Sequence, residues 1–181
     1  GSSMNLIVDD KSKVNWVIWK KIMKLWLKQN IYIEGREWPY KDIKSRIICE
    51  EFIDTNGEDL KDFKIFCFNG EPKLIQVDGN RFTNHQRVYY DPDWNHQPFQ
   101  YGDYNTTYRA EKPMCLKKMI EISRDLSKPF PFSRIDFYSV ENRVIFGEIT
   151  FYPDSGFAAF EPDEYDIIVG NMLNLPKIKL H

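Results

Sequence analysis

Two acidic residues, Asp136 and Glu148, could bind a divalent cation together if the segments that carry them are paired strands. Each lies in a run, 134–138 or 144–153, that alternates side chains at period two and is rich in β-branched and aromatic residues, which is typical of a hairpin. A loop over residues 141–143 would place the two carboxylates opposite each other. Opposed like charges destabilise a sheet unless they are neutralised, and carboxylate oxygens are ligands that Mg²⁺ prefers. The two carboxylates could therefore hold Mg²⁺ together with water and phosphate oxygens, as magnesium is held when it carries a nucleotide.

The same register sorts the other side chains of this hairpin by face. It pairs Val140 with Val144 and Ile135 with Ile149, and it places Phe137 over Gly147. One face is then apolar core, and the other carries Arg134, Asp136, Glu148 and Thr150. Because acidic residues on hairpins are common, spacing alone favours the other interpretation, a solvated face with a charged pair near Arg134.

A second hairpin supplies basic residues. Residues 63–68 and 74–77 read as strands joined by Asn69-Gly70, because this dipeptide provides the two positive φ values of a type I′ turn. Lys64 shares a face with Phe66 and Phe68, where a lysine either reaches solvent along apolar surface or meets an anion. Arg81, just beyond the second strand, is a further cationic candidate. Each residue alone is typical of a surface charge.

Several blocks of the sequence together resemble the TupA-like branch of the ATP-grasp ligases. The resemblance covers nearly the whole chain, and the last block, Phe-Gly-Glu-Ile-Thr-Phe-Tyr-Pro-Asp-Ser-Gly, is the most distinctive. The blocks are residues 36–41, 46–53, 62–70, 76–78, 81–85 and 146–156.

The resemblance implies an α+β, ATP-grasp-like fold with a mostly antiparallel β-sheet and packed α-helices. It implies one domain, in which residues 1–53 are the remnant of a smaller lobe with an adenine hinge and residues 54–181 form the larger C-terminal lobe. The family's glycine-rich phosphate loop and upstream lysine are not found before residue 5, so we expect a chain truncated at the N-terminus. The segment Gly1-Ser2-Ser3 reads either as a cloning scar or as a remnant of the phosphate loop.

The resemblance also implies roles for individual residues, with ATP and Mg²⁺ as cofactors. The final hairpin of ATP-grasp enzymes supplies an Asp, a Glu and usually an Asn to the metal; here these are Asp136, Glu148 and, in place of Asn, Thr150. Basic side chains near the terminal phosphate would be Lys64, Arg81 and Arg134. Adenine would meet the backbone of Glu51 and Ile53, and the ribose Glu58 or Asp59.

The implied function is an ATP-dependent carboxylate–amine ligase that forms an acyl-phosphate in cell-surface polysaccharide synthesis, of teichuronopeptide or capsule. The acceptor would be a small molecule, a saccharide or a peptide. Two other functions stay open: a sugar-modifying enzyme associated with glycosyltransferases, and a non-catalytic module that binds a nucleotide or a sugar.

Composition excludes some other classes of function. The 181 residues suffice for one core, and 25 Lys and Arg against 27 Asp and Glu give a formal charge of −2, which argues against a nucleic-acid-binding surface. Cys49, Cys67 and Cys115 are odd in number and lie among apolar residues, which predicts buried free thiols. With no spanning segment or signal peptide visible, we expect a cytoplasmic protein.

The remaining elements follow from periodicity. Residues 14–29 predict a helix capped by Asp10 or Ser12, whose lysines and three tryptophans fit either an interfacial membrane helix or, as is commoner, an amphipathic helix packed on a sheet. Residues 46–53 predict a strand, and residues 113–126 and 163–173 predict helices.

A long segment over residues 86–111 lacks a clear period over most of its length and carries many aromatic residues. We predict that it forms a substrate loop, with Trp94 and Tyr104 as candidates for stacking on a sugar. The alternative is that these rings only extend the core beneath a long loop.

Overall fold

The computed structural model describes residues 4–53, 60–79, 85–102 and 107–176. The chain divides into two compact units, Gly1–Asn56 and Gly57–His181. Each is described by itself.

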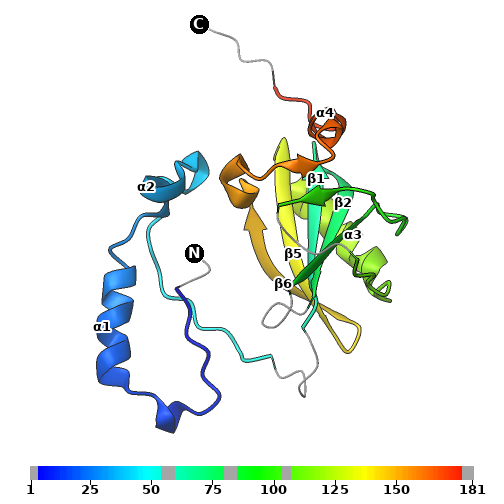
Figure 1. Cartoon of the computed structure of the whole chain (residues 1–181). Coiled ribbons are helices and arrows are strands. Elements are labelled where there is room, and N and C mark those ends of the chain that lie inside the picture. The colour runs from blue at the N-terminus through cyan, green and yellow to red at the C-terminus, as the bar shows by residue number, and fades with distance from the viewer. Residues whose placement is uncertain (1–3, 54–59, 80–84, 103–106, 177–181) are drawn as a thin grey trace, which may run out of the picture. The chain divides into compact units, whose positions relative to one another are not determined.

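The first unit consists of short helices (Figure 1, blue to cyan). Asn15 and Asn30 cap the two α-helices through their side-chain oxygens, which accept from backbone N–H groups, while Asp10 caps only a 3₁₀ turn. No residue of the longer helix is buried. The elements are η1 (Lys11–Lys13), α1 (Trp16–Trp26), α2 (Ile31–Gly35) and η2 (Trp38–Tyr40).

Two expectations for this unit need correction. The predicted helix forms but begins at Trp16 and ends at Trp26. The strand predicted over residues 46–53 is absent, because the whole stretch 43–53 has neither helix nor strand and most of its side chains are exposed. An apolar run forms a strand only where a neighbouring strand pairs with it, and none does here.

The second unit is built on an antiparallel sheet of five strands in the order β3-β2-β1-β5-β6 (Figure 1). Two short strands, β4 and β7, pair with each other in a separate antiparallel sheet. The sheet and the helices confirm the predicted α+β class. The elements are β1 (Asp62–Phe68), β2 (Glu71–Gly79), β3 (Gln86–Tyr90), β4 (Gln100–Tyr101), α3 (Leu116–Ser127), β5 (Phe132–Val140), β6 (Arg143–Thr150), η3 (Pro153–Gly156), β7 (Phe160–Glu161) and α4 (Glu164–Gly170).

The hairpin β1–β2 turns as predicted, with φ of 51° at Asn69 and 83° at Gly70. A bulge follows at once: Cys67 pairs with Pro72, but Phe66 pairs with Leu74. The extra residue shifts the rest of the register by one, so that Lys64 lies opposite Gln76. The bulge therefore decides which residues of β2 share the face of Lys64.

The hairpin β5–β6 differs from its predicted loop. Glu141 and Asn142 both have positive φ, 50° and 61°, so the turn has two residues rather than three, and Val140 pairs with Arg143. The expected pairing of Val140 with Val144 is wrong, and Phe137 pairs with Phe146 rather than with Gly147.

The extra residue that the loop lacks appears instead as a bulge at the site. Ile135 pairs with Ile149, which confirms that part of the register. Before the next pair, Phe137 with Phe146, two residues of β6, Gly147 and Glu148, lie opposite the single residue Asp136. A bulge of this kind re-aims a side chain. It presents Glu148 beside Arg134.

Gly147 gives a test of this bulge. A Cβ at this position would lie 3.1 Å from the backbone oxygen of Asp136, which belongs to a central strand and has little freedom to move. We expect Gly147→Ala to lower the free energy of unfolding by about 1–2 kcal/mol in a denaturant titration. Gly170→Ala is the control, because a Cβ there meets nothing within 4 Å. Equal stability of the two variants would contradict the close approach.

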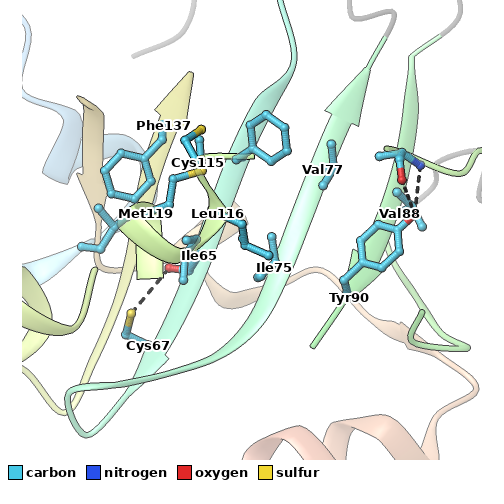
Figure 2. Close-up of a cluster of buried hydrophobic side chains, with 13 residues drawn as sticks. Ile65, Cys67, Ile75, Val77, Val88, Tyr90, Cys115, Leu116, Met119 and Phe137 are labelled. Atoms are coloured by element: carbon cyan, nitrogen blue, oxygen red, sulfur yellow. Dashed lines mark hydrogen bonds between the residues drawn. The ribbon is translucent and has the colours of Figure 1, made fainter. Parts of the chain in front are cut away.

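The main core lies between the sheet and α3, on one face of the strands (Figure 2). Ile65, Ile75 and Phe137 are buried against Met119 and Leu116 of the helix. The helix begins at Leu116 rather than at the predicted Pro113, and its buried side carries the small residues Ser123 and Ser127, which let it approach the sheet closely. This face is apolar, as the sequence pattern predicted.

Among the described residues of the second unit, the opposite face of the sheet has an apolar cover at one end. There Phe66, Phe68 and Leu74 pack with Tyr101 of β4 and Val169 of α4 in a second apolar cluster. The α4 helix falls inside the predicted range 163–173. Beyond this cluster the same face becomes polar.

The segment over residues 86–111 is not simply a loop. Residues 86–90 form the edge strand β3, and Tyr89 and Tyr90 are buried on opposite faces of the sheet. The expectation of a continuous substrate loop is therefore wrong for its first part. Four consecutive residues of β3, Arg87 to Tyr90, are buried, so the strand shows no alternation of polar and apolar side chains.

The cysteines are free, but Cys49 is exposed, which corrects the expectation that all three are buried. Burial raises the pKa of the Cys67 thiol to about 11, so almost no thiolate forms at neutral pH. We expect one thiol of the native chain to react rapidly with a thiol reagent at pH 7.5 and all three after denaturation. Rapid reaction of three thiols in the native state would contradict the burial of Cys67 and Cys115.

Candidate functional site

Polar residues form a row across the face of the sheet that α3 does not cover. Strand pairing places Tyr89 opposite Gln76, Gln76 opposite Lys64, and Lys64 opposite Asp136. All four are buried. A row of buried polar side chains is costly unless each has partners, so the row marks a built site rather than a solvated face.

Lys64 is the centre of this row. Its Nζ donates to Asp62 Oδ2 and, at 2.8 Å, to Asp136 Oδ2, and the residue is only 7% exposed. Burial alone would lower the pKa of Lys64, but the carboxylates of Asp136 and Asp62 outweigh burial and raise it. Burial also raises the pKa of Asp62 in spite of the nearby ammonium. Lys64 is thus held charged between two carboxylates.

Arg134 joins the carboxylates of β5 and β6. Its Nε and Nη2 donate to the two oxygens of Asp136, both at 2.8 Å, and Nη2 also donates to Thr150 Oγ1 at 3.1 Å. The same Nη2 lies 3.6 Å from Glu148 Oε1. Burial opposes the charge of Arg134, but its hydrogen bonds to Asp136 prevail and raise its pKa. A planar guanidinium suits such two-point binding of a carboxylate.

The predicted metal ligands Asp136, Glu148 and Thr150 are therefore neighbours. In the described part of the chain, the side chains of Lys64 and Arg134 neutralise the two carboxylates. Asp136 accepts from Lys64 and Arg134, whereas the Glu148 side chain is 67% exposed and accepts from Thr150 Oγ1 at 3.4 Å. Those residues include no cluster of three or more His, Cys, Asp or Glu side chains arranged around a metal. Two carboxylates and a hydroxyl fit magnesium when phosphate oxygens complete the coordination.

A second charged pair lies beside this cluster. Asp78, opposite Asp62 in the sheet, accepts from Arg87 Nε at 2.7 Å and from Gln76 Nε2 at 3.0 Å. Burial would raise the pKa of Asp78, but the hydrogen bonds and charge of Arg87 lower it below its ordinary value. The pair is almost fully buried.

Arg87 of this second pair also links the edge strand β3 to β4 by a hydrogen bond. Arg87 Nη1 donates to the backbone oxygen of Tyr101 at 3.4 Å, and Tyr89 donates to Gln76 Oε1 at 3.1 Å. The hydroxyl of Tyr101 in turn donates to the backbone oxygen of Pro153 at 3.3 Å, just beyond β6. Both ends of the polar face are thereby fixed.

The other predicted site residues either lie outside the described residues or belong to the first unit, apart from Trp94. Arg81, Glu58 and Tyr104 lie outside the described residues. Glu51 and Ile53 belong to the first unit, in the stretch without helix or strand.

Trp94 lies on the other side of the sheet from Lys64. It stacks on Tyr90, with ring centroids 4.2 Å apart, and it packs against the core that includes α3. This placement agrees with the alternative in which the aromatic residues of this segment extend the core.

Sequence reasoning missed Asp62, Gln76, Asp78 and Arg87. The spacing Asp62-x-Lys64 and Gln76-x-Asp78 signals a shared face on each strand. Counting across the hairpin, however, pairs Lys64 with Ile75 unless the bulge is known. The bulge hid Gln76 and Asp78 and, through Asp78, its partner Arg87, whereas Asp62 follows from the alternation of β1 alone.

Comparison with known proteins adds to this geometry. Residues 1–174 match the model of a family described as TupA-like ATPgrasp. No curated protein and no solved structure was found to match the chain. The family match covers almost the entire sequence, so the chain belongs to the TupA-like ATP-grasp family and is an ATP-grasp ligase-like domain.

Proposed function

We propose that this chain binds Mg²⁺-ATP on the polar face of its sheet and serves an ATP-dependent carboxylate–amine ligation. The observation that carries the proposal is the contact of Lys64 and Arg134 with Asp136, beside Glu148 and Thr150. Two cations and two carboxylates of one face supply groups for phosphate and for metal together. Family membership supports the same assignment.

Asp136, Glu148 and Thr150 would hold the magnesium ion. Lys64 and Arg134 would then bind phosphate oxygens, since each carries donors that suit anions. Magnesium, when bound with the nucleotide, would neutralise charge on the phosphates. Exposure of Glu148 to solvent leaves its carboxylate accessible to an incoming ligand.

Lys64 owes its position to Asp62. The two lie two residues apart on β1 and are hydrogen bonded, and Asp62 is itself buried. An ammonium held in this way is oriented before a ligand arrives, and a pre-oriented charge stabilises a transferring phosphoryl group without reorganisation. Asp62 is therefore a positioning residue in this proposal.

The proposed reaction has two steps. An oxygen of the substrate carboxylate attacks the γ-phosphorus of ATP, the bond from that phosphorus to the bridging oxygen breaks, and ADP leaves. An amine then attacks the acyl-phosphate carbon, loses a proton, and displaces inorganic phosphate. Lys64 and Arg134 would stabilise the charge on the transferred phosphoryl group.

The acceptor and the cellular setting are part of the proposal and rest on the family resemblance. We infer a saccharide or peptide carboxylate as substrate, in cell-surface polysaccharide synthesis on the cytoplasmic side. The described structure offers one guide: Glu148 is the most exposed group of the cluster, so the acceptor would approach past the end of β6.

Calorimetric titration of the purified chain with ATP tests the proposal. We expect one ATP to bind in the presence of Mg²⁺ and to bind at least about tenfold more weakly in EDTA, a difference of ~1.4 kcal/mol. Titrations with a UDP-sugar serve as comparison. Preference for the UDP-sugar would favour a sugar-modifying enzyme, and ATP binding that ignores Mg²⁺ would favour a non-catalytic module.

A further inference from the structure

The helix α1 of the first unit has an unusual charge distribution. From residue 11 to residue 33 the chain carries six lysines and no acidic residue. Lys20, Lys21, Lys24 and Lys28 make no ion pair with any residue that the structure describes, whereas the exposed lysines of the α3 region, Lys118 and Lys128, pair with acidic side chains on their own segment. The charge of α1 is therefore not compensated locally.

The lysines and the apolar residues of α1 lie on different sides of the helix. At 3.6 residues per turn, Lys20, Lys21 and Lys24 fall within an arc of about 100°, which also includes Val17, and Lys28 lies in the turn that follows the helix. The apolar residues occupy most of the remaining circumference, over an arc of about 180°. They are Trp16, Ile18, Trp19, Ile22, Met23, Leu25 and Trp26.

Within the first unit nothing buries this apolar side, whereas the sheet of the second unit buries the corresponding side of α3. The α3 helix buries Leu116 and Met119, whereas α1 buries no residue at all. Trp16, Ile18 and Leu25 are 40%, 53% and 60% exposed. Trp19, Ile22, Met23 and Trp26 are only half-buried. Isolated apolar residues on a surface are ordinary, but a helix with three tryptophans and no buried residue requires a partner.

We propose that α1 lies in the interface of an anionic lipid membrane. Lysines then contact acidic headgroups, while tryptophan and aliphatic side chains enter the boundary between headgroups and acyl chains, where the amphipathic indole ring is favoured. Charge complementarity selects an anionic surface. The apolar arc selects lipid over nucleic acid, whose phosphate backbone would leave the tryptophans without a partner. No described helix is both long and apolar enough to cross a membrane, so the contact is with one surface.

Co-sedimentation of the full chain with lipid vesicles tests this assignment. The probes are vesicles of phosphatidylcholine mixed with phosphatidylserine, and vesicles of phosphatidylcholine alone. We expect binding to the anionic vesicles only, with weakening as salt is raised. Absence of binding to anionic vesicles, or equal binding to both, would overturn the proposal; the apolar side would then be covered by another part of the chain or by a protein.

Two sets of exposed substitutions locate the contact. Each lysine near an anionic surface contributes about fivefold to binding, so K20Q/K21Q/K24Q/K28Q should weaken it at least about 50-fold. The matched control K112Q/K117Q/K118Q/K128Q removes the same charge from the region of α3 and should change binding by less than about fivefold. I18S/L25S keeps every lysine and should also weaken binding at least about tenfold.

Circular dichroism confirms that each variant keeps its helix content. An equal loss in the α3 control, or full binding by either α1 variant, would overturn the proposal. Binding of the chain to a DNA duplex without binding to anionic vesicles would overturn it in favour of a nucleic-acid partner. None of these measurements requires nucleotide, so the result is independent of the function proposed above.

Discussion

Replacing Arg87 with glutamine is expected to lower the free energy of unfolding by about 3–5 kcal/mol at pH 7, which is a large part of the stability of a domain. The cause is Asp78, whose carboxylate is buried and whose pKa Arg87 holds below the ordinary value. Without Arg87, the cost of burying the Asp78 carboxylate would dominate, although Gln76 still donates to it and His85 Nε2 lies 3.5 Å from Oδ1. Chemical denaturation of wild type and variant measures the difference.

The pH dependence of this effect has a definite sign. In the wild type the pKa of Asp78 is lowered on folding, so its contribution is present above the unfolded value and is lost as pH falls through the folded value. In Arg87→Gln the buried Asp78 carboxyl binds a proton more readily, because protonation removes its charge. The difference in free energy of unfolding between wild type and variant should therefore decrease toward pH 4. A gap that is constant with pH would show that Arg87 acts through packing alone.

Arg124→Gln is the matched control for Arg87. Arg124 Nε lies 3.1 Å from Glu71 Oε2, but both side chains are about half exposed. Solvent screens such a pair, so its loss should cost under about 1 kcal/mol. If the two arginine variants lose equal stability, burial is not what makes the Arg87 pair important.

The second large effect is expected for Lys64→Met, which keeps the aliphatic stem and removes the charge. Asp62 and Asp136 would then lie buried without the ammonium that now contacts both, and we expect a loss of about 3–5 kcal/mol at pH 8. Burial already raises the pKa of Asp62, and loss of Lys64 would raise it further. The folded state would then bind more protons than the unfolded state, so the variant should regain stability as pH falls toward 5.

Lys73→Met provides the comparison for Lys64. Lys73 is the exposed extra residue of the bulge in the neighbouring strand, and its loss should change the free energy of unfolding by under about 0.5 kcal/mol. Thermal and urea unfolding at both pH values measure the two variants side by side. Asp136 keeps Arg134 in this variant, so a Lys64→Met protein as stable as wild type at pH 8 would contradict the dependence of the buried Asp62 carboxylate on Lys64.

The strands of the site could be predicted from the sequence because turn residues and the alternation of side chains are local signals. Asn69-Gly70 has the conformational freedom for a two-residue turn, and alternation placed Lys64, Arg134 and Asp136 on the polar face of their strands. What alternation does not provide is the order of strands. The contact between Lys64 and Asp136 joins residues 72 apart in the chain and depends on β1 lying beside β5.

The two bulges explain most of the remaining errors. The predicted three-residue loop after Val140 assigned to the turn an extra residue that the structure places opposite Asp136. The repulsion expected between Asp136 and Glu148 is likewise relieved by Arg134 and Lys64, and this requires burial and pairing that no local pattern encodes. The position of a bulge depends on the residues that pack on both faces of the strand, so it cannot be predicted from side-chain periodicity.

Calorimetric titration of Glu148→Gln with ATP and Mg²⁺ tests whether this face of the sheet binds the magnesium–nucleotide complex. The Glu148 side chain is 67% exposed, so its loss should leave the melting temperature unchanged and separate binding from folding. Glu141→Gln is the control, because its 77% exposed carboxylate lies at the other end of the same hairpin. We predict that Glu148→Gln loses the Mg²⁺-dependent part of ATP affinity, at least about tenfold, while Glu141→Gln retains it. Full Mg²⁺-dependent binding by Glu148→Gln, or no ATP binding by the wild type, would contradict the assignment of this face as the magnesium–nucleotide site.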